Sequence, residues 1–159
     1  MESKYAKLHS ILRYVAALLA IVVFISMFIT KQAVNPNDSA NDFYDFRSGA
    51  FFGDSLCKGN FLAFIGYLFV LLGGLAGLAF VFIDEIIGKD LTKKLAFVAG
   101  GVAVLGAVLV LLFAPLFIAM NGNGFNRLTT GAGPIVFGIL GLAVGGMNIA
   151  APILEEKGK

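Results

Sequence analysis

The apolar residues of this chain are concentrated in four long stretches, and none of the four contains Asp, Glu, Lys, Arg or His. The stretches are residues 14–30, 61–83, 95–119 and 134–154. About 20 apolar residues in a helix, at about 1.5 Å rise per residue, cross about 30 Å of hydrocarbon. The pattern therefore predicts four transmembrane helices, at approximately residues 10–30, 61–83, 95–119 and 134–154.

The composition favours the same fold class. The chain is 58% hydrophobic and 14% charged, with a mean hydropathy of +0.89, whereas soluble domains are roughly one-quarter charged. A small soluble domain cannot bury four helices that are apolar on every face. We therefore predict an all-α integral membrane protein, an up-down bundle of four transmembrane helices that forms a single domain over residues 1–159.

The basic residues are unevenly distributed between the connecting segments. Eight lie in the two terminal segments and the second connection, namely Lys4, Lys7, Arg13, Lys89, Lys93, Lys94, Lys157 and Lys159. Four lie in the first and third connections, namely Lys31, Arg47, Lys58 and Arg127. The positive-inside rule then predicts both termini in the cytoplasm, with residues 31–60 as a long outer loop. The net charge of +2, spread over loops, gives no indication of nucleic-acid binding.

The first apolar stretch has the basic start of a secretory signal, but it is longer than an ordinary signal core. The residues that follow it, 30–34, form a poor cleavage site. We interpret it as an uncleaved anchor, which predicts a multi-pass protein of the plasma membrane or the bacterial inner membrane. The single cysteine, Cys57, excludes an internal disulfide or a cysteine cluster for zinc or iron–sulfur.

The outer loop is rich in aromatic residues. Five of them occur within ten positions, namely Phe43, Tyr44, Phe46, Phe51 and Phe52. Aromatic side chains at this density leave water by one of three routes: into the lipid headgroups, over the outer ends of the helices, or onto a partner protein. We assign these five residues as candidate contacts to a partner or to headgroups.

The shorter connections carry signals for helix ends. Gly88 is predicted to end the second helix, and Asp90 or Thr92 to cap the third. Pro115 is predicted to bend the outer end of the third helix, and Pro134 suits the first turn of the fourth.

Small residues recur at helical spacing in the last three predicted helices, whereas the first contains no glycine. In lipid, close helix approach through small residues drives association. The predicted packing interface comprises two GxxxG pairs, an alanine repeat, one further glycine and one amide, namely Gly73 with Gly77, Gly141 with Gly145, Ala99, Ala103, Ala107, Gly138 and Asn148. We expect Asn148 to turn inward and bond a neighbouring helix, and the first helix to lie at the periphery.

The predicted spans lack ionisable groups at depth, which argues against proton pumps, ion-coupled carriers and voltage sensors. His9 is the only histidine, so one chain cannot provide two axial histidine ligands for haem. It precedes the first stretch and is expected at the surface or among the lipid headgroups. Nucleophilic catalysis also lacks a histidine base near Ser or Cys. We expect no catalytic residues, no cofactor and no metal site.

These patterns favour a non-catalytic accessory or scaffold subunit of a larger membrane complex. Its partners would be the lipid bilayer and other membrane subunits or copies of itself, contacted through glycine-rich faces and the aromatic outer loop. The alternative is a self-associating channel or facilitator for a neutral solute, lined by Asn148 and glycine faces. A weaker alternative is a lipid-processing enzyme that uses the outer-loop carboxylates Asp42, Asp45 and Asp54.

Overall fold

The computed structural model of the chain describes residues 4–30, 32–34, 51–52, 59–121 and 129–157. It contains the helices α1 (Lys4–Ile29), α3 (Phe61–Ile87), α4 (Lys89–Leu111), α5 (Phe113–Asn121) and α6 (Ala132–Lys157), with two short strands, β1 (Ala33–Val34) and β2 (Thr129–Thr130). Helices α1, α3, α4 and α6 are long and apolar enough to cross a membrane. The predicted all-helical multi-pass architecture is thereby confirmed, and which membrane holds it stays a prediction.

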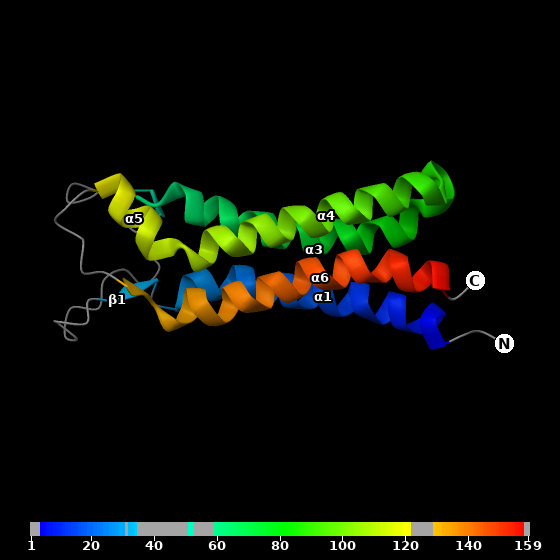
Figure 1. Cartoon of the computed structure of the whole chain (residues 1–159), viewed down its shortest axis with the longest axis horizontal. Coiled ribbons are helices and arrows are strands. Elements are labelled where there is room, and N and C mark those ends of the chain that lie inside the picture. The colour runs from blue at the N-terminus through cyan, green and yellow to red at the C-terminus, as the bar shows by residue number, and fades with distance from the viewer. Residues whose placement is uncertain (1–3, 31, 35–50, 53–58, 122–128, 158–159) are drawn as a thin grey trace.

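The four long helices lie side by side as a bundle (Figure 1). Helices α1 and α4 each pack against both α3 and α6, whereas α3 and α6 contact each other sparingly across the diagonal. The start of α1, the end of α6 and the α3–α4 turn lie at one end of the bundle, which we call the terminal end. The antiparallel strands β1 and β2 lie at the other end, which we call the strand end (Figure 1).

A single residue joins α3 to α4. Gly88 has a φ of 91°, and its N–H donates to the Asp84 carbonyl at 2.9 Å. Only a residue without a Cβ enters this backbone region without strain. Gly88 is also the N-cap of α4, where no side chain caps the helix. The expectation that Asp90 or Thr92 caps α4 is therefore wrong, because the one-residue turn places both of them inside the helix.

The third apolar stretch is not one continuous helix, since α4 ends at Leu111 and α5 begins at Phe113. Pro115 has no N–H to donate to the Leu111 carbonyl four residues earlier. Thr130 of β2 replaces this bond: its hydroxyl donates to the Leu111 carbonyl at 3.4 Å and accepts from the Ala114 N–H at 3.1 Å. A hydroxyl at the strand end thus replaces the backbone hydrogen bond that Pro115 cannot form.

Helix α1 is an integral member of the bundle rather than a peripheral one. It lacks glycine, but α3 supplies one: a Cβ placed on Gly74 would lie 3.1 Å from the Ala16 carbonyl and would overlap Ala20. The small residue needed for close approach is therefore on the partner helix. The outward faces of all four long helices carry exposed large apolar side chains, including Leu18, Phe82, Val98 and Ile139.

Candidate functional site

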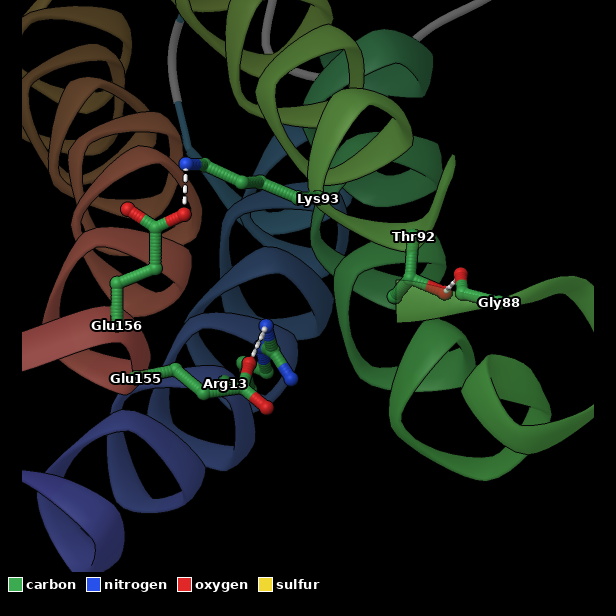
Figure 2. A network of polar contacts seen from close by, with 6 residues as sticks. All are labelled: Arg13, Gly88, Thr92, Lys93, Glu155 and Glu156. Atoms are coloured by element: carbon green, nitrogen blue, oxygen red, sulfur yellow. Dashed lines mark hydrogen bonds and ion pairs between the residues drawn. The ribbon is translucent and has the colours of Figure 1, made fainter. Parts of the chain in front are cut away.

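Two ion pairs tie the end of α6 to both of its neighbours at the terminal end (Figure 2). Arg13 of α1 donates from Nη2 to Glu155 Oε2 at 3.3 Å, and Lys93 of α4 pairs with Glu156. The two pairs differ in burial. The Arg13 and Glu155 side chains are 3% and 26% exposed, against 35% and 56% for Lys93 and Glu156. The first pair is enclosed by the bundle, and the second faces outward.

Arg13 is buried at the edge of a predicted span, so it does not contradict the expectation that the spans lack ionisable groups at depth. The sequence did hold a signal for this pair. Arg13 directly precedes the first apolar stretch and Glu155 directly follows the last. Opposite charges at the ends of two neighbouring antiparallel helices come together, and the low dielectric around them favours pairing.

His9 lies one helical turn before Arg13 and is half-buried. Its Nδ1 atom is buried and has no hydrogen-bond partner within the described part of the chain. A pocket of about 50 Å³ lies nearby at the terminal end, lined by Asp84, Lys89, Asp90, Thr92, Lys93, Pro152, Glu155 and Glu156. At 10–15 Å³ per water, this volume holds a few water molecules and no substrate of ordinary size. Across the described ranges, no three His, Cys, Asp or Glu side chains come together as a metal site requires.

In the interior of the bundle, Asn148 joins α6 to α3. Its Nδ2 donates to the Gly73 carbonyl at 2.9 Å, and the side chain is buried. Its Oδ1 atom has no hydrogen-bond partner among the described residues. This amide lies directly over Gly77, because a Cβ on Gly77 would be 2.6 Å from Asn148 Cγ. Gly77 is therefore the residue that makes room for the asparagine.

The other predicted packing residues also contact one another inside the chain. A Cβ on Gly73 would lie 2.6 Å from the Ala99 carbonyl and 2.9 Å from Ala103 Cβ. A Cβ on Gly141 would lie 2.9 Å from Ala107 Cβ. A Cβ on Gly138 would lie 2.6 Å from the Leu111 side chain, and a Cβ on Gly145 would lie 2.7 Å from the Gly100 carbonyl. These small residues therefore hold α3, α4 and α6 to each other within the chain.

Two glycines that the sequence reasoning did not single out lie on the outside. Gly101 of α4 and Gly146 of α6 are exposed, and an added Cβ at either would meet no atom of the described residues within 4 Å. Their preceding residues, Gly100 and Gly145, face each other across the two helices. One residue turns a helix by about 100°. Because α4 and α6 run antiparallel, that step carries both glycines to the same side of the pair. We call this side the α4–α6 face.

The strand end contains a buried polar network. Gln32 is fully buried: its Oε1 accepts from the Tyr67 hydroxyl at 2.7 Å, and its Nε2 donates to the Thr30 carbonyl at 3.1 Å. The Gly131 N–H donates to the Gln32 carbonyl at 3.0 Å, which continues the network beyond the end of β2. No sequence motif indicates this arrangement, since Gln32 and Tyr67 are distant along the chain.

The aromatic candidates of the outer loop have different outcomes. Phe51 is fully buried, with its ring 6.1 Å from Tyr67 and 6.0 Å from Phe113, so it packs over the helix ends and does not contact headgroups or a partner. Phe52 is exposed. Phe43, Tyr44 and Phe46 lie outside the described residues.

Comparisons of the chain with protein-family models, with curated proteins and with solved structures gave no match.

Proposed function

We propose that this protein is a non-catalytic accessory or scaffold subunit of a larger membrane complex, and that a transmembrane helix of its partner packs on the α4–α6 face. The observation that supports this is the pair of outward glycines, Gly101 and Gly146. Ten of the twelve helical glycines that the structure describes meet another part of the chain within 4 Å, and these two do not.

A glycine inside a helix costs about 1 kcal/mol of helix stability relative to alanine. Close packing of another helix offsets this cost in a membrane, where van der Waals contact drives association. At Gly101 and Gly146 the part of the chain that the structure describes supplies no such contact. A partner helix crossing the α4–α6 face would supply it, because both glycines let its backbone approach closely.

The contact surface in this proposal differs from the one expected from the sequence, since the predicted glycine faces pack within the chain. The exposed ring of Phe52 is a second point for partner contact at the strand end. The channel alternative loses its main support, because Asn148 is buried and bonded to Gly73 rather than placed where a self-assembled pore would be lined. Cytoplasmic termini, in a plasma or bacterial inner membrane, belong to the same proposal.

Purification from native membranes in mild detergent, followed by mass spectrometry, tests this function. We compare the wild type with the double variant Gly101→Leu/Gly146→Leu and with Ala79→Leu, which introduces leucine at an exposed site on α3. A stoichiometric partner should accompany the wild type and Ala79→Leu, and should be lost from the double variant. A lone wild-type monomer, or undiminished partner on a folded double variant, would refute the proposal.

A further inference from the structure

An apolar groove lies between α3 and α4 within their membrane-spanning segments. Its volume is about 220 Å³, and its lining is formed by eight apolar residues, namely Leu72, Gly73, Ala76, Phe80, Leu95, Val98, Ala99 and Val102. On α3 the groove extends from Leu72 to Phe80, which corresponds to about 12 Å along a helix. Leu72 and Val98 are exposed, so the groove opens to the surroundings of the bundle.

The dimensions of the groove favour a linear alkyl chain. A cavity of about 150 Å³ lined by apolar side chains already accepts a benzene molecule, so this groove accommodates a longer apolar segment. A helix is about 10–12 Å wide with its side chains and is too broad to enter it. In a membrane, the abundant linear apolar group is the acyl chain of a lipid.

The side chain of Lys94 lies where the headgroup of such a lipid would be. Lys94 precedes Val98 by one helical turn, so the two share a helix face, toward the terminal end. Lys94 is exposed and forms no hydrogen bond or ion pair with the described residues, whereas Lys93 is paired with Glu156. Asp90 lies one turn further toward the helix start and forms no ion pair with Lys94. Basic side chains at this position beside a groove between helices bind lipid phosphate groups.

We propose that the α3–α4 groove binds one acyl chain of an anionic phospholipid, whose headgroup phosphate pairs with Lys94. This site is separate from the α4–α6 face, and its occupant is a lipid rather than a protein. The polar and apolar parts of the site match the two parts of a phospholipid: the apolar lining lies along the membrane interior, and the unpaired ammonium of Lys94 lies toward the helix start.

Native mass spectrometry of the detergent-purified chain, titrated with phosphatidylglycerol, tests the site. We expect one saturable lipid per chain in the wild type. Ala76→Leu, which fills the groove, should abolish this binding, and the matched variant Ala79→Leu on the exposed face of the same helix should retain it. Lys94→Gln should weaken binding about fivefold, which corresponds to about 1 kcal/mol per basic residue near a lipid surface. Equal binding by wild type and Ala76→Leu would overturn the proposal.

A second measurement works in bilayers and does not depend on the folding of Ala76→Leu. The chain contains no tryptophan, so Phe80→Trp places a single reporter in the groove, and Phe82→Trp places one on the exposed face nearby. Brominated phosphatidylglycerol in a phosphatidylcholine bilayer should quench Phe80→Trp at a lower lipid fraction than Phe82→Trp. Lys94→Gln should remove this difference. Identical quenching of the two reporters would show that both contact only the ordinary surrounding lipid. An unquenched Phe80→Trp would show that protein closes the groove. Either result would refute the lipid site.

Discussion

Replacing Glu155 by Gln removes the anionic partner of a guanidinium that the bundle encloses. Breaking a fully buried ion pair on one side costs about 3–5 kcal/mol, because the remaining charge is left without compensation. Here Glu155 is 26% exposed and Arg13 lies near the terminal end, where water can approach. The amide of Gln also keeps one oxygen that accepts from Arg13. We therefore expect Glu155→Gln to lower the free energy of unfolding by about 2 kcal/mol.

The neighbouring residue provides the control. Glu156 pairs with Lys93, but both side chains are considerably exposed, at 56% and 35%. Exposed ion pairs contribute about 0–1 kcal/mol, so Glu156→Gln should change stability by less than about 0.5 kcal/mol. The two substitutions involve the same chemistry at consecutive positions of α6, and the Arg13–Glu155 pair is the more buried of the two.

The assay is unfolding of the detergent-solubilised protein by increasing SDS, followed by helical circular dichroism. The double variant Arg13→Met/Glu155→Leu should recover most of the stability lost in Glu155→Gln, because apolar residues of similar volume replace a buried ion pair at little cost. Equal, small effects of Glu155→Gln and Glu156→Gln would refute the reasoning. A double variant that is less stable than Glu155→Gln would also refute it. In that case the attraction within the ion pair would exceed the free-energy cost of desolvating the two charges.

Three further substitutions test the interior of the bundle by the same unfolding assay. Gly77→Ala should destabilise the protein by at least about 1 kcal/mol, because the added methyl group overlaps Asn148. The double variant Gly77→Ala/Asn148→Ala should partly relieve this overlap. If the stability losses of the two single variants simply added in the double variant, the contact would be contradicted. Tyr67→Phe should lose about 1 kcal/mol by leaving the buried Gln32 amide oxygen without its donor, whereas Tyr14→Phe, at an exposed position, should be neutral. Thr130→Val should lose about 1–2 kcal/mol by removing the hydroxyl that bonds both sides of the α4–α5 break; Thr130→Ser keeps that hydroxyl, and an equal loss there would exclude this explanation.

Local chemistry in the sequence predicted some helix ends correctly and others not. Gly88 ends α3 as expected, because a residue without a Cβ suits the positive φ of that turn. The caps expected for α4 failed, because the turn is one residue long and leaves no position for a capping side chain outside the helix. The break at Leu112 follows from Pro115, but the donor that compensates it, Thr130, lies too far along the chain for any local pattern to indicate.

The candidate site residues were likewise predicted only in part. The amide of Asn148 was expected to turn inward, since an unpaired amide in hydrocarbon is costly, but only the packed structure identifies the Gly73 carbonyl as its acceptor and Gly77 as its space. The Arg13–Glu155 pair was missed because each residue, taken alone, looks like an interfacial charge at the end of a span.

The sequence by itself determined the membrane environment and the four long helices, because length and apolarity are properties of each segment alone. The tertiary structure decided which small residues are used inside the bundle and which are left outside. Gly100 and Gly101 are consecutive, yet an added Cβ would meet α6 at Gly100 and no described atom within 4 Å at Gly101. A helix turns about 100° per residue, so the role of each glycine depends on where the neighbouring helices stand. That position arises from packing among α1, α3, α4 and α6 together.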